Sequence, residues 1–345
     1  MSKRIVAVGN VNIGESSVSI QSMTNTKTDD IDATISQINA LKNAGCQLVR
    51  CSVPDEKSAM ALKEIIKNVS VPIIADIHFS HKLAIMSADA GVCKIRINPG
   101  NIGGVDKAKY LADYLKERNI ALRIGVNGGS LDSSHSAKPL AQAMRDSALE
   151  YVSVLEKCNF YNTVISAKSS NVKIMIETYR LLHESCDYPL HLGVTEAGLY
   201  HTGIVKSAIG IGSLLCDGIG DTIRVSLSDD PIKEVEAAKD ILKACDKYEK
   251  PYCEIISCPT CARTNIAVKA LAEQVEEMCK DVNKSLKVAV MGCVVNGIGE
   301  SQGANLGVAG GKDKSAIFVD SKYVETVDNA MILPVLKKYI MEYES

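Results

Sequence analysis

Three cysteines near the C-terminus have the residue type and the spacing of metal ligands. Cys258 and Cys261 stand in a Cys-Pro-Thr-Cys motif, and Cys293 follows much later in MGCVVNGIGE. Thiolates in this pattern bind an iron–sulfur cluster or zinc, or they cycle as a redox pair. Structural zinc sites usually close with a second tight pair of cysteines, yet no cysteine follows Cys293. The pattern favours a cluster in which one iron lacks a thiolate and is open to a substrate, with zinc and a redox dithiol as the alternatives.

The other cysteines are interpreted as packing residues. Cys279 lies beside a stripe of apolar residues at helical spacing, and Cys253 lies in a predicted strand. A free thiol in an apolar segment behaves as a small hydrophobic side chain. We therefore expect both to be packing residues, and the same is expected of Cys46, Cys51, Cys93, Cys158, Cys186, Cys216 and Cys245.

The composition limits the classes to which the chain can belong. It has 345 residues, 46% of them hydrophobic, which suits one large domain and a smaller one. The formal net charge of −2 argues against a general nucleic-acid binder, because phosphate backbones need a basic surplus. No apolar run reaches the length of a membrane span, and the run in MSKRIVAV is too short for a secretion signal. Cysteines without such a signal indicate a reducing cytoplasm.

A β-rich run followed by an amphipathic helical stretch occurs eight times. This alternation is typical of parallel βα units, and eight of them predict a (β/α)8 TIM barrel. A doubly wound open sheet is the alternative, but no Gly-x-Gly-x-x-Gly follows the first strand. The preceding KRIVAVGNVNIG is expected to form a hairpin that closes the bottom of the barrel. The predicted strands span 18–23, 47–53, 72–79, 93–98, 121–127, 163–169, 190–196 and 222–228.

A second, smaller α+β domain is expected after Lys250-Pro251. The barrel would span residues 1–250 and the cysteine-bearing domain 251–345. The second domain contains a strand in CEIIS, a long helix, a strand in KVAVMGC and a glycine-rich loop. Two further strands are predicted near 305–309 and 316–319.

Basic residues gather where the barrel strands end. The carboxyl ends of barrel strands face the active-site mouth, and a single arginine there commonly pairs with a carboxylate. Five cations against few carboxylates instead indicate a strongly anionic, phosphorylated ligand. These cations are Arg50, Arg96, Arg123 and Arg224 at strand ends, and Lys206 in the seventh βα segment. The same rim carries Asp76, His78, Asn98, Asn127, Lys168, Ser169, His191, Thr195, Glu196, Ser226 and Ser228.

A set of longer motifs covers nearly the whole chain: SIQSMTNTKT, LVRCSVP, ADIHF, KIRINPGNIG, RIGVNGGSL, ISAKSS, HLGVTEAG and GIGSLLCDGIGDTIRVSL. The motifs CPTCART and MGCVVNGIGE, with their order and spacing, are the most specific. Through these motifs the chain resembles the 4-hydroxy-3-methylbut-2-enyl diphosphate synthase family of the methylerythritol phosphate route to isoprenoids, in its short bacterial form. Ala262, Ile298 and Ser301 depart from the residues that the family commonly has.

This resemblance implies roles for particular residues. Cys258, Cys261 and Cys293 would bind one [4Fe-4S] cluster per chain, with Glu300 as the exchangeable fourth ligand. Glu196 would assist proton transfer at the mouth of the seventh strand. The barrel residues that would bind a cyclic diphosphate are Arg50, Arg96, Arg123, Lys206 and Arg224, with Asn98, Asn127, Ser226 and His78 as hydrogen-bonding groups.

The implied reaction is the reductive ring opening of 2-C-methyl-D-erythritol 2,4-cyclodiphosphate to the linear allylic diphosphate. Reduced ferredoxin or flavodoxin would supply two electrons, and water would be released. The resemblance also implies a homodimer in which each cluster domain caps the barrel of the partner. The second domain is expected to resemble the iron–sulfur domain of sulfite and nitrite reductases. A siroheme-type reductase and a non-catalytic barrel with a structural zinc domain are the alternative functions.

Overall fold

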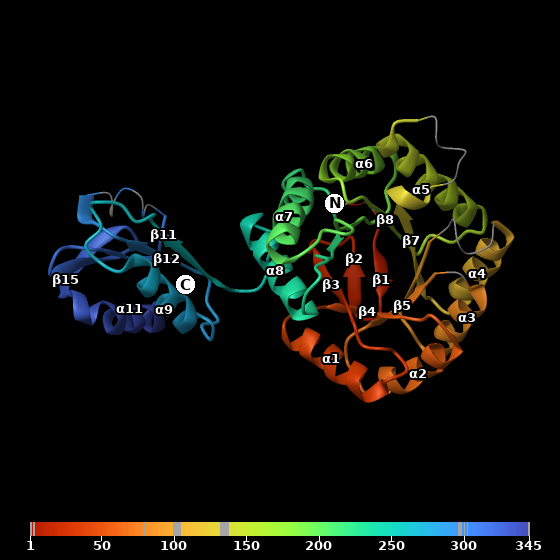
Figure 1. Cartoon of the computed structure of the whole chain (residues 1–345), viewed down its shortest axis with the longest axis horizontal. Coiled ribbons are helices and arrows are strands. Elements are labelled where there is room, and N and C mark those ends of the chain that lie inside the picture. The colour runs from red at the N-terminus through yellow and green to blue at the C-terminus, as the bar shows by residue number, and fades with distance from the viewer. Residues whose placement is uncertain are drawn as a thin grey trace. The chain divides into compact units, whose positions relative to one another are not determined.

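The computed structural model describes residues 2, 4–78, 80–98, 105–131, 138–295, 299, 301 and 303–343. Its contacts divide the chain into two compact units, Met1–Tyr248 and Glu249–Ser345. The first unit is a ring of strands surrounded by helices, and the second is a sheet with helices packed on it (Figure 1).

The first unit contains one eight-stranded sheet in the order β8-β7-β6-β5-β4-β3-β10-β9, in which every neighbouring pair is parallel. A single bridge between Ile165 and Leu190 brings β8 beside the segment that enters β9, so the barrel is nearly closed. The predicted parallel barrel is thus confirmed. Its strands are β3 Ser19–Met23, β4 Leu48–Ser52, β5 Ile73–Ile77, β6 Lys94–Ile97, β7 Ala121–Asn127, β8 Thr163–Lys168, β9 His191–Leu192 and β10 Thr222–Ile223.

A helix follows each barrel strand and packs its apolar face against the outside of the sheet. Several begin at a side chain that accepts a hydrogen bond from the first turn, as Asp55 does from the backbone N–H of Ser58. These helices are α1 Ile31–Asn43, α2 Glu56–Lys67, α3 His81–Ala90, α4 Val105–Glu117, α5 Leu140–Lys157, α6 Val172–Ser185, α7 Tyr200–Cys216 and α8 Pro231–Ala244.

The alternation of side chains along the strands separates the two faces of the barrel wall. Val49 and Cys51 belong to the core between sheet and helices, whereas Leu48 belongs to a different cluster inside the barrel. Arg50 stands two residues after Leu48 and therefore lies on the same inner face. The strands thus present polar and charged groups to the interior above an apolar base.

The N-terminal hairpin forms that apolar base. Strand β1 (Val6–Val8) pairs antiparallel with β2 (Val11–Ile13). Val6, Val8 and Ile13 are fully buried against the inward residues at the amino ends of four strands, Leu48, Ile74, Ala121 and Val164. The hairpin therefore closes the bottom of the barrel, as the sequence predicted.

The second unit is a five-stranded mixed sheet in the order β11-β12-β13-β14-β15. The first three strands run parallel and the last two pair antiparallel. The helices α9 (Val268–Cys279) and α11 (Ile332–Glu342) bury apolar residues against one face. The edge strand β15 and helix α11 were not predicted from the sequence. The strands are β11 Cys253–Ser257, β12 Leu286–Met291, β13 Leu306–Ala309, β14 Lys314–Val319 and β15 Lys322–Asp328.

The cysteines differ in burial more than the sequence indicated. Cys46, Cys51 and Cys279 are buried, but Cys216 is exposed at the end of α7, so its predicted burial is wrong. Its position follows Leu214 and Leu215, which point inward, and the helical rotation turns the next residue outward. Five of the others are half-buried: Cys93, Cys158, Cys186, Cys245 and Cys253.

No helix among the described residues is both long and apolar enough to cross a membrane.

Candidate active site

Buried arginines share few carboxylates inside the barrel. Arg96 donates from Nη1 to Oδ1 of Asp76 at 3.1 Å, and Arg50 Nε lies 3.7 Å from Oδ2 of the same carboxylate. Arg224 pairs with Glu234 at 3.3 Å. Arg50, Arg96 and Arg224 therefore pair with carboxylates, as is common for single arginines in a barrel. Each ion pair also fixes the position of a guanidinium group in the interior.

Arg123 and Lys168 have no carboxylate partner among the described residues. Arg123 donates from Nε to Ser166 Oγ at 3.0 Å, while its Nη1 is buried without a partner in the part of the chain described. Burial lowers the pKa of both side chains well below its ordinary value, and neighbouring arginines lower it further. An anionic ligand would offset this repulsion, because it supplies the negative charge that the protein does not.

Two glycines on the inner face of the wall provide room for the side chains of Arg96 and Lys168. A Cβ added to Gly125 of β7 would lie 2.8 Å from Arg96 Nε. One added to Gly193, just after β9, would lie 2.6 Å from Lys168 Nζ. Side chains at these positions would displace the two charged groups, so the glycines help define where an anion can bind.

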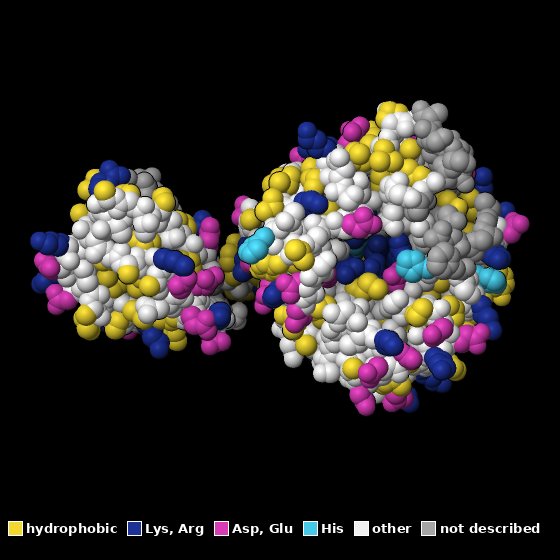
Figure 2. Space-filling view, in the orientation of Figure 1, with side chains coloured by type: hydrophobic (Ala, Val, Ile, Leu, Met, Phe, Trp, Pro, Cys, Tyr) yellow, Lys and Arg dark blue, Asp and Glu magenta, His cyan; other side chains and the backbone are white. Residues whose placement is uncertain are grey.

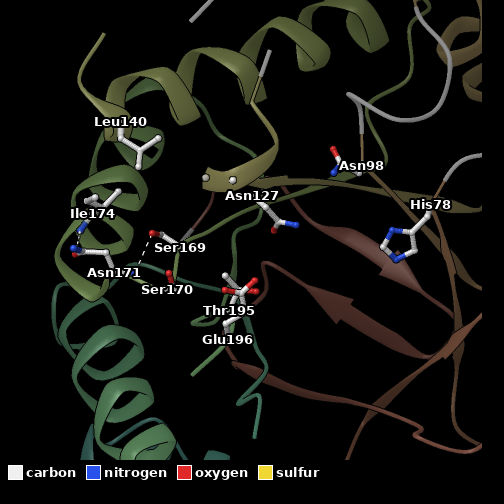
Figure 3. Close-up of a pocket in the computed structure, with 12 residues that line it drawn as sticks. His78, Asn98, Asn127, Leu140, Ser169, Ser170, Asn171, Ile174, Thr195 and Glu196 are labelled. Carbon is white, nitrogen blue, oxygen red and sulfur yellow. Dashed lines mark hydrogen bonds between the residues drawn. The ribbon is translucent and has the colours of Figure 1, made fainter. Parts of the chain in front are cut away.

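The mouth of the barrel opens into a cavity of about 560 Å³, and most of the residues that line it are polar. Lysine and arginine atoms are visible at the bottom of the hollow in Figure 2. In Figure 3, Asn127 at the end of β7, Ser169 just after β8 and Glu196 in the segment after β9 surround the space, and His78 lies at the opposite rim. The lining includes four residues that the sequence predicted for the site, namely His78, Asn98, Asn127 and Glu196.

Glu196 has an unusual backbone conformation. Its φ is +51°, in the left-handed region that residues other than glycine, asparagine and aspartate rarely adopt. Strain of this kind persists where surrounding structure fixes the chain, often at functional sites. The conformation places the carboxylate of Glu196 at the cavity, in accord with its predicted position at the mouth of the strand.

The structure separates the two candidate lysines. Lys206 is half-buried in α7 and is not among the described residues that line the cavity. Lys168, at the end of β8, is buried and feels the charges of Arg123, Arg224, Arg50 and Arg96. The sequence places Lys168 at the rim and predicts Lys206 as the lysine that binds the anion. The position of Lys168 inside the barrel could have been predicted from its spacing. It stands two residues after Ser166, and alternate residues of a strand lie on the same face, here the inner one.

Glu234 was also missed. It lies in the first turn of α8, is almost fully buried, and accepts from Ser22 Oγ, from the backbone N–H of Leu227 and from Arg224. Its burial could have been predicted from the sequence, because Glu234 lies at helical spacing from Ala238 and Ile241 on the apolar face of the helix. Ser226, which the sequence proposed, is half-buried just beyond β10.

The three predicted cysteine ligands surround one small cavity in the second unit. Cys258 follows β11 and Cys293 follows β12, and these adjacent strands are parallel, so both residues reach the same edge of the sheet. Together with Cys261 they line a space of about 130 Å³. Its other walls are Pro259, Arg263, Met291 and Gly292.

Backbone N–H groups donate hydrogen bonds to two of the three thiols. The backbone N–H of Gly292 donates to Cys258 Sγ at 3.1 Å. A hydrogen bond from the backbone N–H of Arg263 lowers the pKa of the Cys261 thiol. Such N–H···S bonds are typical of protein-bound iron–sulfur clusters. Among the described residues, no group of three or more histidine, cysteine or acidic side chains is placed to hold a metal ion. Glu300 lies outside the described residues.

Comparison with known protein families assigns both units. Residues 3–239 match the family model described as GcpE TIM-barrel domain, and residues 254–342 match the GcpE protein C-terminal domain. The chain belongs to the GcpE family.

Relatives in the GcpE family extend over nearly the whole chain. A protein of Fusobacterium nucleatum named 4-hydroxy-3-methylbut-2-en-1-yl diphosphate synthase (flavodoxin) is 49% identical over 98% of this chain and 97% of its own length. A protein of Clostridium perfringens with the same name is 50% identical over the same shares of the two chains.

Solved structures show the fold of the barrel alone. The dihydropteroate synthase of Stenotrophomonas maltophilia superposes with a TM-score of 0.55 at 13% identity, covering 72% of this chain and 100% of that one. The Yersinia pestis dihydropteroate synthase gives a TM-score of 0.53 at 12% identity, covering 70% and 98%. At identities this low, the similarity shows a shared fold and gives no information about the reaction.

Proposed function

We propose that this GcpE-family protein is a 4-hydroxy-3-methylbut-2-enyl diphosphate synthase. It converts 2-C-methyl-D-erythritol 2,4-cyclodiphosphate into the linear allylic diphosphate in isoprenoid precursor biosynthesis. The observation that carries the proposal is the near full-length identity of about half to relatives with that name. The reaction consumes two electrons and two protons and releases one water, so the protein needs a polyanion site and a route for electrons.

The barrel interior suits the cyclic diphosphate. Arg123 and Lys168 are buried cations without carboxylates among the described residues, and a diphosphate would neutralise them. Arg50, Arg96 and Arg224 add guanidinium groups that Asp76 and Glu234 hold in place. We assign the lysine contact to Lys168 in place of Lys206, because Lys168 lies among the arginines.

Polar groups at the mouth would orient the rest of the substrate. His78, Asn98 and Asn127 line the cavity. Ser226 lies two residues after Arg224, which directly follows strand β10. Glu196 is the carboxyl group that we propose to deliver a proton to the departing oxygen, since it lies at the cavity and is not buried.

The second unit would hold the electron-transfer group. The thiols of Cys258, Cys261 and Cys293 fit one [4Fe-4S] cluster, because they enclose a common space and one of them already accepts a backbone N–H. Glu300 is proposed as the fourth ligand, because a carboxylate would be a hard, exchangeable ligand on a soft cluster. Such a cluster stores single electrons and offers an iron as a Lewis acid. The mixed sheet that carries the thiols is proposed to be akin to the iron–sulfur domain of sulfite and nitrite reductases.

The partners follow from the same proposal. The relatives' names specify flavodoxin, and we propose reduced flavodoxin as the electron donor, with ferredoxin as a chemically equivalent one. The many free thiols among the described residues suit a reducing cytoplasm. A homodimer, in which the cluster domain of one protomer covers the barrel of its partner, would bring the two sites together.

An anaerobic turnover assay tests the proposal. Purified protein with reduced flavodoxin and the cyclic diphosphate should form the linear allylic diphosphate, detected by mass spectrometry. Arg123→Ala should abolish most of the product, whereas Arg180→Ala, which changes an exposed arginine paired with Asp217, should leave the rate unchanged. Absence of product from wild-type protein with a full complement of iron would refute the assigned reaction.

A further inference from the structure

Two thiols outside both proposed sites lie close together on the surface of the barrel. Cys216 is the last residue of α7, and Cys245 directly follows α8, the neighbouring helix (Figure 1). Their sulfur atoms are 3.9 Å apart. The Cys245 thiol also lies 3.8 Å from the backbone oxygen of Gly212, one helical turn before Cys216. The sulfur of Cys245 is therefore held against α7 directly beside Cys216.

The two thiols differ in access to solvent. Cys216 is exposed, whereas Cys245 is half-buried behind it. Burial and, to a smaller extent, the adjacent Cys216 raise the pKa of the Cys245 thiol to about 11. A reagent from solution therefore reaches Cys216 first, and Cys245 is placed to react with whatever forms there.

We propose that Cys216 and Cys245 form a reversible redox pair, in which Cys216 reacts with a small-molecule disulfide and Cys245 closes an intramolecular disulfide. In the first step the thiolate of Cys216 attacks the reagent, forms a mixed disulfide and releases one reagent thiol. In the second step Cys245 attacks the sulfur of Cys216, and the second reagent thiol leaves. The two protein thiols lose two electrons and two protons, and the disulfide reagent gains them.

The bond would connect the ends of two helices that flank part of the substrate site. The segment between the two cysteines contains Arg224 and its buried partner Glu234. A cross-link around this segment restricts its unfolded conformations and leaves the arginine pair inside the closed loop. The disulfide thus stabilises the eighth βα unit against unfolding under oxidising conditions. Reduction breaks the disulfide and restores the two thiols.

The test treats the full-length, cluster-containing protein with oxidised glutathione under anaerobic conditions. Free thiols are then blocked with N-ethylmaleimide, and peptides are mapped by mass spectrometry without reduction. In wild type we expect a Cys216–Cys245 cross-link that dithiothreitol removes. In Cys245→Ser the cross-link is lost and glutathione accumulates on Cys216. In Cys216→Ser, Cys245 stays unmodified over the same time.

The half-buried Cys158 provides a matched control, since none of the described hydrogen bonds links it to a second thiol. It should carry little glutathione and form no cross-link. Stable glutathione on Cys216 of the wild type, at the level seen in Cys245→Ser, would overturn the proposal, because Cys245 would then not resolve it. So would a wild-type Cys216 that does not react.

Discussion

Arg96 and Asp76 form a buried ion pair between adjacent strands, with Arg96 Nη1 3.1 Å from Asp76 Oδ1. Burial alone would raise the pKa of Asp76. The charge of Arg50, a hydrogen bond from His78 and the charge of Arg96 outweigh that effect and hold the pKa well below its usual range. Asp76 is therefore ionised whenever the protein is folded near neutral pH, and it fixes the positions of two of the arginines that we propose to bind the substrate.

Replacing Asp76 by asparagine should destabilise the protein strongly. Arg50 and Arg96 would keep their buried charges without a carboxylate, and breaking a buried pair in this way costs about 3–5 kcal/mol. Denaturant unfolding of Asp76→Asn measures the loss. Glu56→Gln is the control, because Glu56 pairs with Lys82 on the surface, where the effect is about 0–1 kcal/mol. Equal stability of the two variants would show that the buried pair contributes nothing.

The same carboxylate predicts a dependence of stability on pH. Because the folded pKa of Asp76 lies below its unfolded value, its contribution is present above the unfolded pKa of about 4 and is lost as the pH falls below it. Wild-type protein should thus lose stability on acidification more steeply than Asp76→Asn. Unfolding free energies measured across that acid range provide the comparison. Parallel curves for the two proteins would contradict the assignment.

Lys168 and Lys206 make opposite predictions for the same chemical change. Lys168→Met should weaken binding of the cyclic diphosphate by about 1.5–3 kcal/mol, or roughly ten- to a hundredfold in KM, because one charge-assisted contact is lost. Lys206→Met should leave KM unchanged, since Lys206 does not line the cavity. A larger effect at Lys206 than at Lys168 would restore the assignment made from sequence.

Loss of one thiolate should abolish the metal centre. Anaerobically purified wild type is expected to contain about four irons and four sulfides per chain, and Cys293→Ser to contain few of either. Cys279→Ser should retain the full content, because Cys279 is buried between α9 and the sheet, where it packs in the apolar core. Stoichiometric zinc in place of iron would rule out the cluster.

A mixed-dimer experiment tests whether the two sites come from different protomers. One chain carries Arg96→Ala with Arg123→Ala, and the other carries Cys258→Ser. If each cluster serves the barrel of its partner, half of the randomly mixed dimers are heterodimers with one working site, so about a quarter of wild-type activity returns. Heterodimers of proven composition that remain inactive would show that each barrel uses its own cluster.

The sequence predicted the barrel because its strands and helices repeat with a clear change of period. It did not predict β15, in which Val327 is the only buried residue, since an exposed edge strand lacks the apolar alternation that marks its neighbours. Cavity-lining positions were predictable where a strand ends in a polar residue, as at Asn127 at the end of β7. Glu234 was not, because its pairing with Arg224 and Ser22 arises only when α8 packs against the barrel at β3. The exposed side of Cys216 likewise depends on how α7 is rotated against the barrel.

The hairpin of β1 and β2 has a kinetic consequence. In the part of the chain that the structure describes, Val6, Val8 and Ile13 close one end of the barrel, so the mouth serves both arrival and departure. A new substrate molecule must wait until the spent diphosphate has left by the same opening. Inhibition by the product should therefore be competitive with substrate. The hairpin residues, which lie at the opposite end of the barrel from its mouth, thereby make product release a condition for the binding of the next substrate molecule.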